Sequence, residues 1–185
     1  LTSQHFLVEP GRLYSIARRT NRLGGKAKAS ASRTLWPGSI PAMTDPLSPI
    51  HEAQDFLRTS TIDAWLVYDY QGMNPALADV LGVDGFFTRP IFLLVPPTAK
   101  PTLLISAVDA GQLTRTDLNA HVYQGREDAH RELSVMLKDM SNVAMEYSPM
   151  RELPRASRVD AGTVELVRSL GVDVVSSAEL LQYAT

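Results

Sequence analysis

From residue 48 to residue 175, short apolar runs of strand length alternate with segments whose apolar residues recur at helical spacing. Loops rich in Gly, Pro, Asn and Asp separate these segments. Such alternation is typical of a sheet whose faces are covered by helices, because a crossover between parallel strands usually contains a helix. The pattern therefore predicts the α/β fold class, with a mixed β-sheet flanked by helices.

The strands are predicted from apolar runs that are too short to be helices. The runs at 91–95 and 102–106 are joined by PPTAKP, whose prolines end both strands, so this pair is predicted to form a hairpin. The predicted strands are 64–68, 91–95, 102–106, 122–123, 143–147 and 172–175.

The helices are predicted from capping residues and from apolar positions that share one face. They run from Ser48 through Leu57, over 76–81 with Gly82 after the last turn, from Asp128 through Met140, from Asp160 to Gly171, and from Ser176, which forms a capping box with Glu179.

Residues 1–42 differ in composition from the rest of the chain. They hold seven of the eighteen Lys and Arg residues but one acid, Glu9. A segment of this kind cannot bury enough apolar surface to offset its ordering entropy, so it is predicted to be disordered. Three interpretations stay open: a spurious extension upstream of Met43, an Arg- and Ser-rich transit peptide, and a basic binding arm. The folded domain is predicted over residues 43–182.

The rest of the chain is acidic. It carries eleven basic and nineteen acidic residues, a net charge of −8, although the whole chain has a charge of only −2. Nucleic-acid surfaces need clustered positive charge, and no apolar run here is long enough to span a bilayer. The chain has no cysteine, which excludes disulfides and thiolate sites. We expect a cytoplasmic protein with no nucleic-acid and no membrane partner.

No short catalytic motif occurs in the sequence, neither HExxH, GxGxxG, a P-loop nor a GxSxG elbow. The four histidines, His5, His51, His121 and His130, belong to no ligand pair and are interpreted as solvent-facing. No catalytic residue and no metal ligand is therefore predicted in this chain.

Asp69, Asn74 and Arg89 are the candidates for contact with a substrate or with another subunit. Asp69 and Asn74 lie in the loop after the first strand, at the edge where α/β proteins often place ligands. Arg89 precedes the strand at 91–95 and can bind a carboxylate or a neighbouring subunit. The alternative interpretations are a turn-forming Asp69 that binds its own backbone, and a solvated Arg89 at a strand end.

Several other side chains are assigned structural roles. Asp109 and Asp117 flank Arg115 and are predicted to form exposed ion pairs with it. Glu146 lies in the strand at 143–147 and is predicted to pair with an arginine. Trp65 falls within an apolar run and is predicted to belong to the core.

Residues 143–182 resemble the N-terminal domain of the creatinase/prolidase family, most specifically in AMEYSP, SRVDAGTVELVRSLG and VVSSAELLQ. Upstream, DAWLVYDYQGMNPALADVLG and TRPIFLLVP are similar to the first strand, the Asn-Pro loop and the Arg-led second strand of the Xaa-Pro peptidase branch. The resemblance covers residues 48–182 and implies a creatinase N-terminal-domain-like fold.

The resemblance also implies a function. Family members join this domain to a C-terminal "pita-bread" domain, in which two Asp, one His and two Glu bind two divalent ions such as Mn or Zn. These ions activate a water molecule that attacks the peptide bond before proline. The N-terminal domain supports dimer contacts and restricts access to the active site. The chain is thus expected to be an inactive fragment of a homodimeric, metal-dependent Xaa-Pro aminopeptidase or dipeptidase that acts on peptides.

Two alternatives stay open. One is a stand-alone binding or dimerisation module without enzymatic activity, which a stable dimer of residues 43–185 would favour. The other is a fragment of a creatinase-fold enzyme with another specificity, such as a creatine hydrolase or a lyase. Only the residues that would bind the metals and the substrate separate this second alternative from a peptidase.

Overall fold

The computed structural model describes residues 48–83, 86–113 and 115–184. The predictions for residues 1–42 lie outside this part of the chain. The described residues form a six-stranded sheet in the order β4-β3-β2-β1-β5-β6. Its strands are β1 (Ala64–Asp69), β2 (Ile91–Val95), β3 (Thr102–Ser106), β4 (Asn119–Tyr123), β5 (Asn142–Met145) and β6 (Asp173–Ser176).

The sheet is mixed, as predicted. β2 pairs antiparallel with both β1 and β3, which confirms the hairpin on either side of PPTAKP. β4 runs parallel to β3, whereas β5 runs parallel to β1 and β6 parallel to β5. The strands β1, β3, β4, β5 and β6 therefore all end at the same edge of the sheet, and the loops that follow them gather there.

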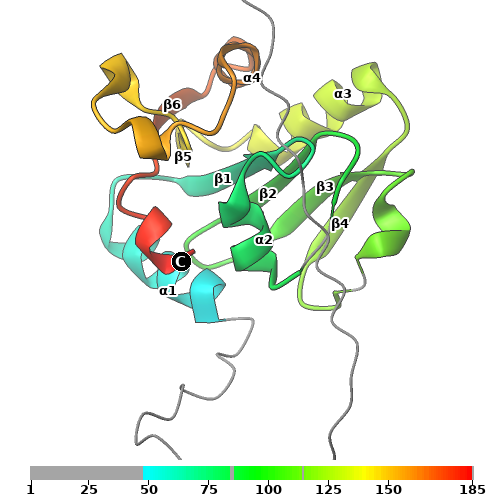
Figure 1. Ribbon diagram of the computed structural model, residues 1–185, viewed down its shortest axis with the longest axis horizontal. Coiled ribbons are helices and arrows are strands. Elements are labelled where there is room, and N and C mark those ends of the chain that lie inside the picture. Colours follow the sequence, from blue (N-terminus) through cyan, green and yellow to red (C-terminus); the bar gives the residue numbers. More distant parts are fainter. Residues whose placement is uncertain (1–47, 84–85, 114, 185) are drawn as a thin grey trace, which may run out of the picture. The chain divides into compact units, whose positions relative to one another are not determined.

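Helices cover both faces of this sheet (Figure 1). α1 (Ser48–Thr59) and α2 (Pro75–Leu81) pack on one face, and α3 (Arg126–Leu137) and α4 (Ala161–Ser169) pack on the other. The central strands β1 and β2 are buried along their whole length. Burial on both faces explains why they appear in the sequence as continuous apolar runs instead of alternating ones.

The two faces of the sheet form two separate apolar cores. Trp65 and Val67 of β1 point toward α1 and α2, whereas Leu66 and Tyr68 point toward α3 and α4. This alternation follows from the two-residue period of a strand. Trp65 has no exposed surface, which confirms its predicted place in the core.

Two of the helix predictions fail at their caps. α3 begins at Arg126 with Gly125 as its N-cap, so Asp128 does not cap it in the predicted way. The Asp128 carboxylate instead reaches back and accepts a 2.8 Å hydrogen bond from the backbone N–H of Gln124. The closing α-helix predicted from Ser176 and Glu179 does not form: the chain makes a turn and then a short 3-10 helix, Leu181–Tyr183.

Three capping residues have their predicted roles, although α3 ends at Leu137 and not at Met140. Asp160 caps α4 by accepting a 2.9 Å hydrogen bond from the backbone N–H of Thr163. Gly82 follows α2 in a left-handed conformation with φ of 63°, and Gly171 follows α4 with φ of 85°. Residues other than glycine rarely adopt such dihedral angles, so both glycines end their helices for a steric reason.

Candidate functional site

The loop between β1 and α2 is shaped by Asp69. One oxygen of its carboxylate accepts a 2.7 Å hydrogen bond from the backbone N–H of Asn74, and the other accepts a 2.9 Å bond from that of Gly72. Gln71 and Gly72 both have left-handed backbones, with φ of 58° and 71°. Asp69 is also buried. In this structure it has the turn-forming role, and its carboxylate is directed into its own loop.

Asn74 connects this loop to the core. Its side-chain oxygen caps α2 by accepting a hydrogen bond from the backbone N–H of Ala76. Its side-chain nitrogen donates to the carbonyl of Tyr68 at 2.8 Å and to the carboxylate of Glu146 at 2.7 Å. Asn74 is 2% exposed, so its amide is not available to a ligand. Its interactions make it a structural residue.

Glu146 stands at the centre of a buried polar network. The indole N–H of Trp65 and the hydroxyl of Ser177 donate to one carboxylate oxygen at 2.7 and 3.0 Å, and Asn74 donates to the other. The predicted pairing of Glu146 with an arginine is therefore wrong. All its partners are neutral, and they come from distant segments that the fold brings to the end of β5.

The environment of Glu146 determines its chemistry. Burial raises the pKa of its carboxyl above the ordinary value, although the hydrogen bonds from Trp65, Ser177 and Asn74 oppose that shift. The residue has no exposed surface. It therefore holds the end of β5, the loop after β1 and the segment after β6 together, and it has no access to a dissolved substrate.

Arg89 forms no hydrogen bond with Asp69 or Asn74, although it lies near the end of β1. Its guanidinium is exposed and donates a 3.1 Å hydrogen bond to the carbonyl of Thr88. Its backbone N–H donates to the carboxylate of Asp109 at 3.0 Å. The structure thus bonds Asp69, at the end of β1, to Asn74 in the loop that follows, whereas the exposed Arg89 guanidinium contacts only the carbonyl of Thr88.

The predicted ion pairs around Arg115 are correct only for Asp117. The guanidinium of Arg115 forms a two-point ion pair with the Asp117 carboxylate, which holds the pKa of that carboxyl below its usual range. Asp109 is 1% exposed and takes no part in this pair. Its carboxylate instead accepts hydrogen bonds from the backbone N–H groups of Thr88 and Arg89.

A groove of about 1360 Å³ lies between α3 and α4, above the sheet. Its floor is formed by side chains of the central strands, including Tyr68, Phe92 and Tyr123, which are themselves buried. Arg89, Arg126 and Arg158 line it as well, together with the exposed side chains Tyr70, Met73 and Val108. The groove was not predicted, but the arginines follow a recognisable pattern, since each lies beside the edge at which β1, β4 or β5 ends.

The two floor tyrosines are unsuited to acid–base chemistry at neutral pH. The pKa of Tyr123 is raised to about 12, mainly by burial and to a smaller extent by the negative charge of Asp109. Burial also raises the pKa of Tyr68 above its ordinary value. Both hydroxyls therefore remain protonated at neutral pH, and the floor of the groove offers aromatic surface and no base.

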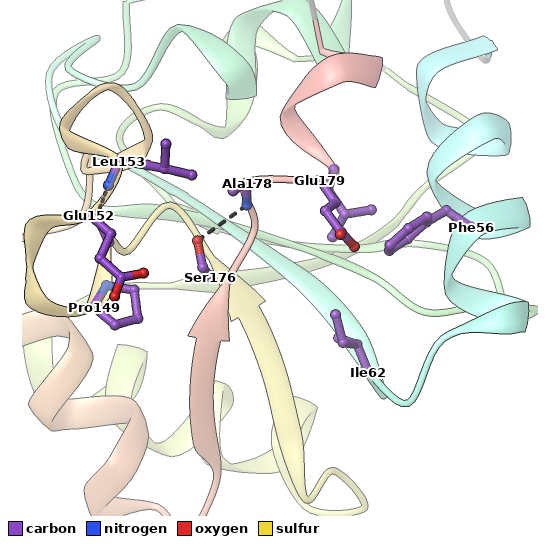
Figure 2. Close-up of a pocket in the computed structure, with 10 residues that line it drawn as sticks. Phe56, Ile62, Pro149, Glu152, Leu153, Ser176, Ala178 and Glu179 are labelled. Carbon is purple, nitrogen blue, oxygen red and sulfur yellow. Dashed lines mark hydrogen bonds between the residues drawn. The ribbon is translucent and has the colours of Figure 1, made fainter.

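A second, smaller cavity of about 290 Å³ lies between α1, the loop after β5 and the segment after β6 (Figure 2). Phe56, Ile62 and Leu153 give it apolar walls, and the carboxylates of Glu152 and Glu179 lie at its rim (Figure 2). The hydroxyl groups nearby are used locally: Ser148 accepts from the N–H of Leu153 and Ser176 from that of Ala178. This lining contains no nucleophile–base pair.

The histidines form no cluster within the described residues. His51 is exposed and His130 lies half-buried along the groove, while the Nδ1 atom of His121 lies 2.9 Å from the Glu132 carboxylate. In the described part of the chain, no group of three or more His, Asp and Glu side chains is placed to hold a metal ion. Nor is any helix of that part long and apolar enough to cross a membrane.

No protein-family model and no curated protein matches this chain. Solved structures do. Dipeptidase PepE from Mycobacterium ulcerans matches with a TM-score of 0.57 and 15% identity, over 75% of this chain and 37% of that one. A Creatine_N superfamily domain of a dipeptidase from Streptococcus thermophilus matches with a TM-score of 0.51 and 13% identity, over 75% of this chain and 98% of that one.

A third match has the same extent. The creatinase/prolidase N-terminal domain of an X-Pro dipeptidase from Streptococcus pyogenes is 14% identical, with a TM-score of 0.50, over 72% of this chain and 95% of that one. This chain thus spans about a third of the length of the Mycobacterium dipeptidase, but nearly the whole of the separately solved domains. The described part of the chain has the fold of the creatinase/prolidase N-terminal domain.

Proposed function

We propose that this chain supplies the N-terminal, non-catalytic domain of a metal-dependent Xaa-Pro peptidase, either a dipeptidase or an aminopeptidase. The observation that carries the proposal is the fold, because structures matched over nearly their whole length are N-terminal domains of dipeptidases. The absence of cysteine is compatible with the reducing cytoplasm as the place where the peptidase works.

In this proposal, catalysis belongs to another part of the peptidase. A pair of divalent ions needs several carboxylates or imidazoles that converge on one point. The described residues do not fit such a pair, because no three of their His, Asp and Glu side chains come together to hold an ion. The role left to this domain is to contact a second subunit and to restrict access to the active site.

The edge at which β1 and β3 end is suited to such contacts. Tyr70 and Met73 in the loop after β1, Phe86 before β2 and Val108 after β3 are all exposed. Aromatic, methionine and arginine side chains are enriched in protein interfaces relative to the rest of the surface. Arg89 adds a charged group to the same edge. We therefore assign this edge to contact with the partner subunit and with the mouth of its active site.

Release of proline from an Xaa-Pro dipeptide, in the presence of Mn²⁺, tests this proposal. Two polypeptides are compared: this chain, and the full product of the gene that encodes it. We expect release by the full product, and none by this chain alone. A full product that folds, takes up Mn²⁺ and leaves every Xaa-Pro peptide intact would overturn the proposal.

A stand-alone binding module is the second candidate, and the groove between α3 and α4 favours it. A domain that only supports catalysis elsewhere has no need for a large open cleft of its own. Light scattering coupled to size-exclusion chromatography measures the oligomeric state, but a dimer of this chain would be compatible with both the peptidase domain and the stand-alone module.

The two candidates are separated by function. Ligand binding in the groove, without any peptidase activity of the full product, would favour the stand-alone module.

A further inference from the structure

We propose that the groove between α3 and α4 binds an aliphatic carboxylate, with the carboxylate among Arg89, Arg126 and Arg158 and the alkyl chain along the floor. This inference depends on the lining of the groove and not on peptidase activity. Arg89 belongs both to this lining and to the edge assigned above to the partner subunit, so the inference concerns the chain on its own.

The charged end of the groove is set by the topology of the sheet. Arg126 begins α3 directly after β4, Arg158 precedes α4 after β5, and Arg89 lies just before β2, beside the end of β1. All three guanidinium groups are exposed and line the same groove. Arginine binds carboxylates through paired N–H groups, so three of them at one end favour an anionic head group.

These arginines are not neutralised by the domain itself. In the described part of the chain, neither Arg126 nor Arg158 has an ion-pair or hydrogen-bond partner for its side chain, and the Arg89 guanidinium contacts only a carbonyl. Two acids also line the groove. The Asp160 carboxylate is already held by the N–H and the hydroxyl of Thr163, and Glu165 lies more than one turn further along α4.

The floor of the groove consists mainly of aromatic and aliphatic side chains, among them Tyr68, Phe92 and Leu133. The Tyr123 hydroxyl donates to the carbonyl of Pro90 at 2.6 Å. Two serines of the lining are engaged with nearby backbone groups: the Ser106 hydroxyl accepts from the N–H of Val108, and the Ser169 hydroxyl donates to the carbonyl of Leu166. A ligand on the floor would therefore contact mainly aromatic and aliphatic side chains.

This lining distinguishes an alkyl chain from a peptide. A peptide that lay on the floor would find few partners for its own N–H and C=O groups, and each buried group that stays unpaired costs free energy. An alkyl chain has no such groups and gains from every methylene that leaves water. The groove volume of about 1360 Å³ also exceeds what one small head group fills. The arginines and the floor together therefore favour an amphiphile with a single negative charge.

The test uses dodecanoate below its micellar concentration, with binding measured by isothermal titration calorimetry on the purified chain. We expect saturable one-to-one binding that weakens by at least about tenfold when the acid is shortened to octanoate, because four methylenes are lost. Dodecyltrimethylammonium keeps the tail and reverses the charge, and we expect no saturable binding of it. A short apolar peptide with a free carboxylate tests the peptide alternative, and it too is expected not to bind.

Two pairs of variants place the ligand in the groove. Arg158→Ala is expected to weaken dodecanoate binding about fivefold, since it removes one charge-assisted contact. Arg155→Ala is the matched control, because Arg155 is exposed in the same loop but does not line the groove. On α3, Ala129→Trp places a large side chain in the groove and should weaken binding, whereas Ser134→Trp on the exposed side of that helix should not.

Several results would overturn the proposal. They are the absence of saturable dodecanoate binding, equal binding of dodecyltrimethylammonium, and preferred binding of the peptide. Equal effects of Arg158→Ala and Arg155→Ala would likewise contradict it. If Ala129→Trp does not fold, the arginine pair alone decides. None of these results changes the expected peptidase activity of the full product, so the two proposals fail separately.

Discussion

The indole Nε1 atom of Trp65 lies 2.7 Å from a carboxylate oxygen of Glu146, and both side chains are shielded completely from solvent. Trp65 belongs to β1, whereas Glu146 follows β5, the strand that pairs with β1. Asn74 and Ser177 complete the set of donors around the same carboxylate. The end of β5, the loop that carries Asp69 and the segment after β6 are therefore fixed by one acidic side chain.

We predict that Glu146 makes the stability of the domain depend on pH. Burial raises the pKa of its carboxyl in the folded protein above the ordinary value of 4.5. The folded state then binds a proton more tightly than the unfolded state. The stability that this provides is complete below the unfolded pKa and is lost as pH rises through the folded pKa. Urea unfolding should show that the free energy of unfolding falls as pH rises through this range. Glu146→Gln should remove this dependence on pH.

Glu179→Gln is the control for this measurement, since Glu179 is exposed at the rim of the smaller cavity. Its free energy of unfolding should follow that of the original protein at every pH. The interpretation of Glu146 would be wrong if Glu146→Gln and Glu179→Gln had the same dependence on pH.

We predict that Trp65→Phe destabilises the domain by about 1–3 kcal/mol, because it removes a hydrogen-bond donor from a buried carboxylate. The loss should be smaller when Glu146 is already glutamine, since no buried charge is then left short of a donor. A double-mutant cycle of these two substitutions measures the coupling directly. Strict additivity of the two changes would show that the indole N–H contributes nothing to the network.

Asp109 provides a third prediction. Its buried carboxylate accepts hydrogen bonds from the backbone of Thr88 and Arg89 and from the side chain of Gln112. Asp109→Ala leaves these donors without a partner and should lower the free energy of unfolding by roughly 2–4 kcal/mol. Asp139→Ala is the matched control at an exposed position and should change it by less than about 0.5 kcal/mol. Equal effects of the two would contradict the role given to Asp109.

The ion pair of Arg115 and Asp117 predicts a dependence on pH of the opposite sign. The hydrogen bond from Arg115 lowers the pKa of Asp117 below its ordinary value of 3.8. This pair therefore stabilises the protein above the unfolded pKa, and the effect is lost as pH falls through the folded pKa. Asp117→Asn should be less stable than the original protein by about 0.5–1 kcal/mol at pH 7, and the difference should vanish in acid. A difference that persists in acid would rule out the ion pair as its cause.

The sheet and the helices on its faces could be predicted because their signals are local. The runs at Trp65 and at Ile91 are apolar throughout, as strands buried on both faces must be. Asp160 and Gly171 mark the two ends of α4 through backbone geometry that few other residues supply. Signals of this kind lie within a few residues of the element that they define.

The polar network could not be predicted from the sequence, because its members are distant in the chain. Glu146 contacts residues 72 and 81 positions away, at Asn74 and Trp65, and no local pattern indicates such partners. The cap of α3 failed for another reason. Asp128 is a suitable capping residue, but it lies in the first turn of α3, and Gly125 takes the N-cap position.

The measurement that most directly tests the central claim is the amount of divalent metal that this chain binds. The claim is that the described residues bring no set of ligands together for a pair of catalytic ions. After equilibrium dialysis against Mn²⁺ or Zn²⁺, elemental analysis should find far less than one ion per chain, and unfolding should be insensitive to chelators. Two tightly bound ions per chain, together with chelator-sensitive release of proline from an Xaa-Pro dipeptide, would contradict this account.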